Sequence, residues 1–335
     1  MKRIGLMGCG KVAGYGHLPA LKKCPDLELA AIFEPDEKRL AEAKAAFGVP
    51  RAFAHVEAFF ESGIDAVSIT SPAPCHHQNV LDAARHGKHV LCEKPLAMTE
   101  SEARDMIAAM KDANLMLFTG FVYRFTPEAA KIKELVAQRK IGDVRSLRLI
   151  YNWNCHGRYE IDEQGNRIEQ RRRMGRMLEG GPMVDCGAHQ IDLARWWLGS
   201  DIVRHYGVGA WLEDYEAPDH MYLHLDHANG AHTMVEISYS YCHTAKEPIY
   251  RFIYELIGTE GIIRYDTRED VFEVRSSSET KQFSRGSTKD FDAMYASFAK
   301  ALETGSPGDM PTGEDGMIST RIAREATEAA IARRL

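Results

Sequence analysis

The sequence has little that would suit a secreted, zinc-binding or membrane-spanning protein. Its seven cysteines are odd in number, scattered and without a C-x-x-C pair, which argues against a disulfide framework and a zinc knuckle. The first residues, "MKRIGLMGCG", leave no room for the apolar core of a signal peptide, and no later run approaches membrane-spanning length. A formal charge of −6 and a pI of about 6.2 do not favour nucleic acid or an anionic membrane as partner. We therefore expect a cytoplasmic protein that binds a small molecule.

The length and the apolar patterning predict two domains. A chain of 335 residues exceeds the usual size of one hydrophobic core. From Lys2 to about Gly120, short apolar runs alternate with helical patterns, which is typical of βαβ units in a doubly wound parallel sheet. The later chain is rich in strand patterns separated by Asn-Gly and Gly-x-x-Gly turns, which predicts an α+β domain with a mainly antiparallel sheet. The predicted fold class is α/β, with domains over residues 1–124 and 125–335.

A glycine-rich turn follows the first predicted strand. The stretch "RIGLMGCGKVA" places Gly8-x-Gly10-x-x-Ala13 between that strand and a helical pattern. Glycines permit a tight turn and let the backbone approach a pyrophosphate, whose charge then lies at the helix N-terminus. Alone, this spacing is a weak signal, because glycines also occur in ordinary turns.

An acidic residue ends the second predicted strand, "LELAAIFEPD". Glu34 follows Gly10 at the distance where a Rossmann fold presents a carboxylate to the adenosine ribose. An NADP site would favour a positive residue there, and the next ones, Lys38 and Arg39, come a helical turn later. The pattern therefore favours NAD over NADP, and the alternative is that Glu34 is only a surface acid.

A lysine follows the fifth predicted strand, in "KHVLCEKPLAM". Glu93, Lys94 and Pro95 come directly after the apolar run, and open α/β sheets bind ligands at the carboxyl ends of their strands. Pro95 biases Lys94 toward an extended backbone, which would aim the ammonium group into that crevice. From the residues alone, a surface lysine paired with Glu93 is an equally good interpretation.

Several motifs occur together along nearly the whole chain. They are Gly8-x-Gly10-x-x-Ala13, Ser71-Pro72 with His76, Glu93-Lys94-Pro95, "GFVYRFTP", "GGPMVDCGAHQIDLARWWLG", "GTEG" and "TGEDG". In this combination the chain resembles the Gfo/Idh/MocA family of NAD(P)-dependent oxidoreductases, which includes glucose-fructose oxidoreductase and inositol dehydrogenase. The resemblance implies a Rossmann domain followed by an α+β domain with a large open sheet. Because that sheet often makes oligomer contacts in the family, we expect a homodimer or homotetramer.

The resemblance also implies a cofactor site and shows two departures from the family. The cofactor-binding residues that it implies are Gly8, Gly10, Lys11, Val12, Glu34, Ser71, Pro72, His76, Glu93 and Lys94. The family usually has Asn after the proline of the fourth-strand loop, whereas Ala73 stands here, so that a side-chain contact to the cofactor is missing. The segment from Asn154 to Glu179 is longer than usual, which leaves the substrate open.

The stretch "PMVDCGAHQIDLARWWLG" has the signals of one helix. A Gly-Gly pair precedes it, Pro182 suits its first turn and Gly199 its end. The spacing of four residues would place Asp185 and His189 on the same face, where the simplest interpretation is an ordinary surface pair. The glycine turn and Lys94 favour a catalytic interpretation instead.

Oxidation of an alcohol requires a group that accepts the hydroxyl proton. Histidine can do so near neutral pH, and a neighbouring carboxylate can orient and stabilise it. By resemblance, the family carries such an Asp-x-x-x-His pair, and its Glu-Lys-Pro lysine meets the substrate oxygen. We therefore assign His189 as acid/base, Asp185 as its partner and Lys94 as electrostatic positioner. Whether Lys94 or His189 takes the proton stays open.

No metal centre is predicted. His156, His220, His224 and His243 have no recognisable zinc spacing. The arginine-rich segment "NCHGRYEIDEQGNRIEQRRRMGRMLE" is nearly balanced by acids, which is typical of a solvated loop or a subunit contact. Because it precedes the helix of His189, one or two of its arginines could bind an anionic substrate such as a sugar acid. The predicted substrate-binding residues are Tyr123, Arg124, Trp153, Arg158 and Arg173.

The predicted function is hydride transfer between NAD and a secondary hydroxyl of a sugar, cyclitol, sugar acid or related polyol. One alternative is an NAD-using glycosidase that oxidises its substrate transiently and releases no net NADH. Another is a non-catalytic dinucleotide-binding regulator, against which the presence of Lys94, Asp185 and His189 argues.

Overall fold

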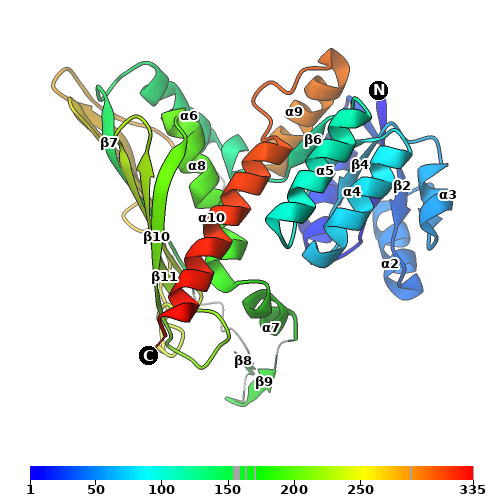
Figure 1. Ribbon diagram of the computed structural model, residues 1–335, viewed down its shortest axis with the longest axis horizontal. Helices are drawn as coiled ribbons and strands as arrows, with labels where there is room; N and C mark the ends of the chain where they lie inside the picture. Colours follow the sequence, from blue (N-terminus) through cyan, green and yellow to red (C-terminus); the bar gives the residue numbers. More distant parts are fainter. Residues whose placement is uncertain (154–158, 163, 170, 287–288, 335) are drawn as a thin grey trace. The chain divides into compact units, whose positions relative to one another are not determined.

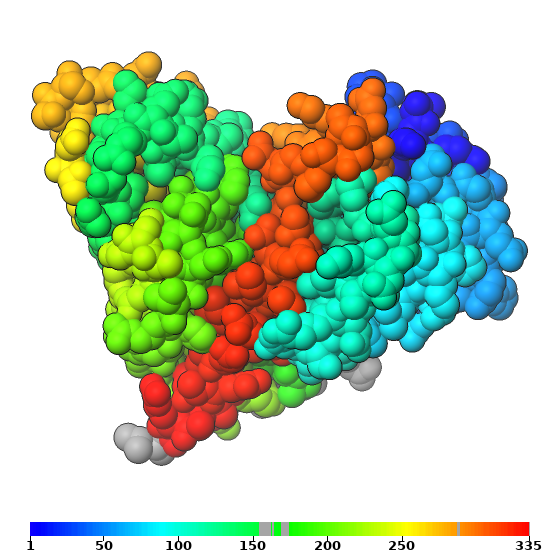
Figure 2. Space-filling model, turned by 45° about the horizontal axis from the view of Figure 1, so that its top comes forward, coloured from blue at the N-terminus to red at the C-terminus, as the bar shows by residue number. Residues whose placement is uncertain are grey.

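The computed structural model describes residues 1–334 except 154–158, 163, 170 and 287–288. These residues divide into two compact units. The first comprises Met1–Phe125 together with α9 (Phe291–Thr304) and the start of α10 (Gly313–Ala332) up to Thr320. Figure 2 shows the orange surface of α9 beside the blue surface of the first strands and helices. The domain boundary predicted at residue 124 placed α9 and the start of α10 in the second domain, whereas here they belong to the first unit.

Six parallel strands form the sheet of the first unit, in the order β3-β2-β1-β4-β5-β6 (Figure 1). The strands are β1 (Lys2–Met7), β2 (Leu27–Phe33), β3 (Arg51–Phe53), β4 (Ala66–Ile69), β5 (His89–Cys92) and β6 (Leu117–Thr119). The order reverses between β1 and β4, so the carboxyl ends of these two strands flank the point where open α/β sheets bind ligands.

Helices cover both faces of this sheet, as predicted. They are η1 (Ala13–His17), α1 (Leu18–Lys23), α2 (Glu37–Phe47), α3 (Val56–Phe60), η2 (Ala73–Cys75), α4 (His76–Arg85), α5 (Glu100–Asp112) and η3 (Val122–Phe125). One apolar core contains residues of α1, α2 and α9, and a second contains residues of α3, α4 and α5. A sheet buried on both faces explains the nearly continuous apolar runs of the central strands.

The termini of α2 and α5 show why the predicted helices form where they do. Asp36 accepts a hydrogen bond from the backbone N–H of Arg39, and Gly48 ends α2 in the left-handed region at φ 61°. Thr99 and Glu102 form a reciprocal capping box at the start of α5. Both helices carry an acidic residue in the first turn, which suits the helix dipole.

The second unit is built on an eight-stranded sheet in the order β10-β11-β12-β7-β13-β14-β15-β16. Its strands are β7 (Val144–Asn152), β10 (Ile202–Ala210), β11 (His220–His227), β12 (His232–Ser238), β13 (Arg251–Gly258), β14 (Gly261–Asp266), β15 (Val271–Ser276) and β16 (Thr280–Gln282). Only the pair of β12 with β7 is parallel within this sheet, so the prediction of a mainly antiparallel sheet is confirmed. The Asn-Gly turn closes the β11–β12 hairpin, with Gly230 at φ 81°.

Helices pack against one face of this sheet (Figure 1). The second unit contains α6 (Pro127–Ala137), α7 (Arg171–Leu178), η4 (Met183–Gly187), α8 (Ala188–Leu198) and the remainder of α10, and a small hairpin of β8 (Tyr159–Ile161) and β9 (Arg167–Glu169). Trp197 of α8 is buried, and its indole N–H donates to the carbonyl oxygen of Ala129 in α6 at 3.0 Å. This contact fixes the two helices side by side.

Candidate functional site

The glycine turn lies at the reversal of strand order in the first sheet. Gly8 has φ 96°, and a Cβ at this position would lie 2.6 Å from the backbone nitrogen of Ser71, which follows β4. A side chain is therefore excluded both by conformation and by contact. At Gly10 a Cβ would meet nothing within 4 Å, and the helical segment begins at the next residue, Lys11. Open space in front of a helix N-terminus fits a pyrophosphate.

Glu34 directly follows β2 beside this turn and is only 4% exposed. Its Oε2 accepts the backbone N–H of Cys9 at 2.9 Å, which ties the carboxylate to the glycine turn. Its Oε1 accepts from the backbone of Asp36 at 3.1 Å and from the guanidinium of Arg39 at 3.0 Å. The sequence interpretation placed Arg39 a helical turn away from the ribose site, whereas the structure pairs it with the acid itself. Burial and the Glu34 charge raise the pKa of the Cys9 thiol to about 12, so this thiol stays protonated.

The predicted cofactor residues after β4 form a linked group. Asn79 of α4 donates to Oγ of Ser71 at 2.8 Å. His76 is 1% exposed, with Nε2 at 2.9 Å from the carbonyl oxygen of Ser71 and Nδ1 at 2.9 Å from that of Pro95. Burial lowers the pKa of His76 more than its hydrogen bonds and the Glu93 charge raise it. The imidazole thus lies between the loop after β4 and the loop after β5, and when neutral it donates its single N–H to one of the two carbonyl oxygens. A contact with the cofactor stays a prediction.

Lys94 follows β5 at the same carboxyl edge, and the carboxylate before it is buried. Glu93 is 7% exposed, and its Oε2 accepts the backbone N–H of Lys94 at 3.2 Å. A Cβ on Gly120, directly after β6, would lie 2.9 Å from its Oε1 and 3.3 Å from the Cα of Glu93, so a larger residue there would press on this carboxylate. Burial alone would raise the pKa of Glu93, but a hydrogen bond from His17 and the charges of His17, Lys94 and Lys289 leave that pKa below its ordinary value. Glu93 therefore holds a negative charge beside Lys94.

The two predicted substrate residues of η3 are both buried. Tyr123 is 4% exposed, and the ammonium group of Lys289 lies 5.8 Å from the centre of its ring. Arg124 is 6% exposed and pairs with Asp315 of α10 at 3.2 Å. The guanidinium of Arg124 therefore links η3 to the returning segment within the first unit, and its role toward a substrate stays a prediction.

Asp185 and His189 lie in the second unit, in a helix that differs from the predicted one. A π-helical turn, η4, carries Asp185, and α8 begins only at Ala188 and ends at Gly199 with φ 55°. π-helical turns widen the spacing of side chains and often occur at functional sites. His189 is 4% exposed in the first turn of α8.

Two side chains that the sequence analysis did not single out hold Asp185. The hydroxyl of Tyr239 donates to Oδ2 of Asp185, and the guanidinium of Arg176 lies 3.1 Å from the same oxygen. Arg176 belongs to α7, within the arginine-rich segment, so one arginine of that segment serves Asp185. Tyr239 follows β12, and its only signal in the sequence was its place at the end of a strand. That Asp185 orients His189 stays a prediction.

Of the three remaining predicted substrate residues, the structure describes the side chain of Trp153 but not those of Arg158 and Arg173. Trp153 follows β7, stacks on Tyr151 with ring centres 6.1 Å apart and meets Tyr239 edge-on at 6.3 Å. Trp153 therefore contacts Tyr239, the residue whose hydroxyl donates to Asp185. Arg158 lies outside the described residues, and Arg173 belongs to α7, with a side chain outside the description.

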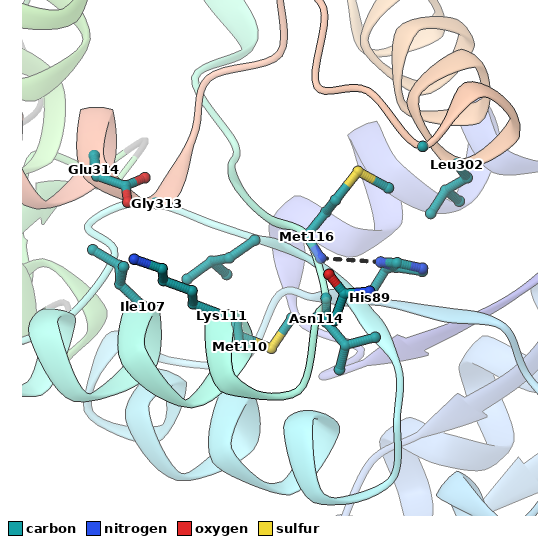
Figure 3. Close-up of a pocket in the computed structure, with 12 residues that line it drawn as sticks. His89, Ile107, Met110, Lys111, Asn114, Met116, Leu302, Gly313 and Glu314 are labelled. Carbon is teal, nitrogen blue, oxygen red and sulfur yellow. Dashed lines mark hydrogen bonds between the residues drawn. The ribbon is translucent and has the colours of Figure 1, made fainter.

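A surface cavity of about 510 Å³ lies at the opposite edge of the first sheet (Figure 3). His89 and Leu117, at the starts of β5 and β6, line it together with Met110 and Lys111 of α5. The backbone N–H of Met116 donates to Nδ1 of His89 at 3.0 Å, as the dashed line in Figure 3 marks. Because dinucleotides bind at the carboxyl ends of parallel strands, this cavity is separate from the glycine turn and Lys94.

Among the side chains that the structure describes, no three His, Cys, Asp or Glu residues gather in a geometry that could hold a metal ion. Within the same part of the chain, no helix combines the length and apolar character that crossing a bilayer requires.

Comparison with known proteins identifies the family. A model described as "Oxidoreductase family, NAD-binding Rossmann fold" matches residues 2–121, and one described as "GFO/IDH/MocA C-terminal domain" matches residues 129–264. The chain belongs to the Gfo/Idh/MocA family of oxidoreductases. The predicted Rossmann fold, family and oxidoreductase class are thereby confirmed.

Individual relatives agree with this assignment. The chain is 33% identical to Myo-inositol 2-dehydrogenase of Thermotoga maritima over 215 residues, which cover 64% of this chain and 60% of that protein. It is 30% identical to D-xylose 1-dehydrogenase (NADP(+)) 2 of Haloferax volcanii over 237 residues, 70% of this chain and 69% of that protein. A crystal structure of a probable dehydrogenase from Thermotoga maritima superimposes with a TM-score of 0.81 at 26% identity, covering 99% of this chain and 97% of that chain. All three proteins are named as dehydrogenases. The alternatives of an NAD-using glycosidase and of a non-catalytic dinucleotide-binding regulator are therefore not supported.

Proposed function

We propose that the protein transfers a hydride between NAD and a secondary hydroxyl of a sugar, cyclitol, sugar acid or related polyol. The observation that carries the proposal is the glycine turn, in which Gly8 lies against Ser71 at the reversal of strand order while Gly10 faces open space. The names of the inositol and xylose dehydrogenases support the substrate class. Bound nicotinamide dinucleotide would supply the hydride acceptor.

The residues of this chain would then bind the dinucleotide, orient the substrate hydroxyl and accept its proton. In the proposal the turn from Gly8 to Lys11 and the helix after it hold the pyrophosphate, and Glu34 meets the ribose hydroxyls. Lys94 orients the reacting oxygen by its charge, and His189 accepts the hydroxyl proton with Asp185 as its partner. Tyr123, Arg124, Trp153, Arg158 and Arg173 are the proposed substrate contacts.

NAD is proposed as the preferred cofactor because Glu34 presents a carboxyl group directly after β2. The family description names NAD, whereas the Haloferax relative carries NADP(+) in its name. The choice between the two dinucleotides therefore depends on Glu34 and the paired Arg39 of this chain.

The activity test uses purified protein, NAD and a panel of polyols, sugar acids and nitrophenyl glycosides, with NADH absorbance and phenol release recorded together. We expect NADH to form with at least one polyol or sugar acid, and His189→Ala to lower kcat by about 10²- to 10⁴-fold. A matched control is His227→Gln, since His227 is also buried and bonds Thr233 at 2.9 Å. Phenol release without net NADH, or NAD binding without any turnover, would contradict the proposal.

Self-association through the sheet of the second unit is also proposed. Tyr206, Val208 and Tyr222 share one face of β10 and β11, with Val208 directly opposite Tyr222, and are 51%, 50% and 38% exposed. Exposed apolar side chains in such a row are typical of protein interfaces. Sedimentation of the wild type and of Val208→Glu/Tyr222→Glu should show a dimer or tetramer and its dissociation; a monomeric wild type would contradict the proposal. A cytoplasmic location stays a prediction.

A further inference from the structure

Two buried histidines hold the residues on either side of Lys94. Nε2 of His17 lies 3.0 Å from Oε1 of Glu93, the residue before the lysine. Nδ1 of His76 lies 2.9 Å from the carbonyl oxygen of Pro95, the residue after it. The two side chains are 0% and 1% exposed, so neither is placed to meet a substrate directly. They come from separate elements, η1 and α4, which pack around the end of β5.

His17 is the middle of a longer hydrogen-bonded chain. Its Nδ1 lies 2.7 Å from the hydroxyl of Tyr295 in α9, and that hydroxyl lies 2.7 Å from Oγ of Ser68 in β4. The Glu93 carboxylate can only accept, so Nε2 of His17 donates to it. The hydroxyls of Tyr295 and Ser68 continue the chain from Nδ1 of His17. Burial raises the pKa of Tyr295 far above its ordinary value, so this hydroxyl keeps its proton.

This series of hydrogen bonds ends at the carboxylate of Glu93, which neighbours Lys94. Oε1 of Glu93 takes the hydrogen bond from His17, and Oε2 takes the backbone N–H of Lys94. The titratable and charged groups that face Glu93 are His17, Lys94, Lys289, His76, Tyr295 and Cys92. Among them the imidazole of His17 makes a direct side-chain hydrogen bond, which fixes the rotamer of the carboxylate. If that bond were lost, the buried carboxylate would have to move or take up a proton.

We propose that His17 and His76 are positioning residues for Lys94, with Tyr295 and Ser68 fixing the orientation of His17. The pair holds the backbone of the Glu93-Lys94-Pro95 segment at both ends and keeps a carboxylate beside the lysine. Lys94 thereby keeps a carboxylate neighbour and a fixed backbone on both sides. The proposal rests on the proposed function, because Lys94 orients the reacting oxygen there.

The kinetic test compares His17→Leu with His17→Gln, whose side-chain amide can still donate to Glu93. We expect His17→Leu to lower kcat by about 10- to 100-fold without changing the Kd for NAD, and His17→Gln to recover most of the loss. The alkaline limb of kcat against pH should move to lower pH in His17→Leu, because Lys94 loses its anionic neighbour. His76→Leu and His76→Asn test the other side through kcat alone, because His76 is also a predicted cofactor residue and its variants can change the Kd for NAD as well.

Tyr295→Phe provides a milder variant, should His17→Leu fail to fold. It removes only the hydroxyl that fixes His17, so we expect a smaller loss in kcat in the same direction. Tyr265→Phe is its matched control, since the Tyr265 hydroxyl is also buried and lies 3.4 Å from Glu128 in the second unit. An equal effect of both tyrosine variants on kcat would overturn the proposal.

A measurement on Lys94 itself does not depend on finding a substrate. Lysines of the full chain are methylated with ¹³C-formaldehyde, the Lys94 signal is assigned by its loss in Lys94→Arg, and its chemical shift is followed against pH. We expect the titration midpoint of Lys94 to fall by about one pH unit in His17→Leu and to stay in place in His17→Gln. An unchanged midpoint in a folded His17→Leu protein overturns the positioning role. Absence of turnover in the wild type would instead refute the proposed function. The Lys94 titration would still test whether His17 positions Lys94.

Discussion

The guanidinium of Arg39 donates to Oε1 of Glu34 at 3.0 Å, so a cation and an anion lie against each other directly after β2. Glu34 is nearly buried, whereas the side chain of Arg39 is 56% exposed. The acid is held in place by the backbone of Cys9 and Asp36, and the arginine is held mainly by the acid and by Asp36. The carboxylate therefore controls where the arginine points.

Removing the carboxylate should release Arg39 toward a 2′-phosphate. We expect Glu34→Gln to lower the ratio of kcat/KM for NAD to that for NADP by about 10- to 100-fold, since a charge-assisted hydrogen bond contributes roughly 1.5–3 kcal/mol. Steady-state kinetics with both dinucleotides measures the ratio. Arg39→Ala in the Glu34→Gln background is the control and should remove the gain with NADP. An unchanged ratio in Glu34→Gln would show that another group selects the cofactor.

Alanine variants of the three glycines in the turn and its helix should affect stability and NAD binding separately. Gly8→Ala should lower the melting temperature, because its Cβ would meet the Ser71 backbone at 2.6 Å in a conformation with φ 96°. Gly10→Ala should leave the melting temperature unchanged and raise the Kd for NAD by about tenfold or more, since its Cβ would enter the space facing the pyrophosphate. Gly14→Ala, whose Cβ meets nothing within 4 Å, is the control for both measurements. Equal Kd values for Gly10→Ala and Gly14→Ala would argue against a pyrophosphate at Gly10.

Tyr239 should affect turnover through Asp185. Tyr239→Phe removes the hydroxyl that donates to Asp185 and keeps the ring that meets Trp153. We expect kcat to fall by about tenfold while the Kd for NAD stays the same, because groups that orient a catalytic residue typically contribute 10- to 100-fold. Arg176→Met should act in the same direction by removing the ion pair of Asp185. A Tyr239→Phe enzyme with wild-type kcat would mean that Asp185 needs no such support.

The sequence predicted the first unit well because its signals are local. Strand, glycine turn and helix follow one another within a few residues around Gly8, and Glu34 directly follows the next strand, so βαβ rules suffice to place them. The same is true of the capped helices α2 and α5 and of the hairpin turn at Gly230. In each case the deciding interactions are made between residues close in the chain.

What the sequence did not reveal depends on contacts between distant segments. Tyr295 reaches His17 across most of the chain, and its helix pattern gives no sign that α9 returns to the first unit. Tyr239 meets Asp185 from the end of β12, and Arg176 differs from its neighbouring arginines only in where α7 places it. Pattern rules count residues along one element and therefore cannot pair side chains from two.

Five histidines with lowered pKa values predict a loss of stability in mild acid. Burial lowers the pKa values of His76 and His89 in the first unit and of His220, His224 and His227 in the second. An unfolded chain takes up these protons below about pH 6.5, whereas the folded chain takes them up only at lower pH. The unfolded state therefore binds more protons in that window, and the free energy of unfolding must fall as the pH falls from about 6.5.

Thermal unfolding at about pH 7.5 and about pH 5.5, at one ionic strength, measures this effect, and we expect the lower melting temperature at the lower pH. His227→Gln should reduce the difference, since the amide can keep the contact with Thr233 but takes up no proton. Carboxylates whose pKa values are lowered, Glu93 among them, add to the loss only at more acidic pH, below their ordinary range near 4. A melting temperature that is constant or rises between these two pH values would contradict the role of the histidines, because proton uptake by the unfolded chain can only lower it.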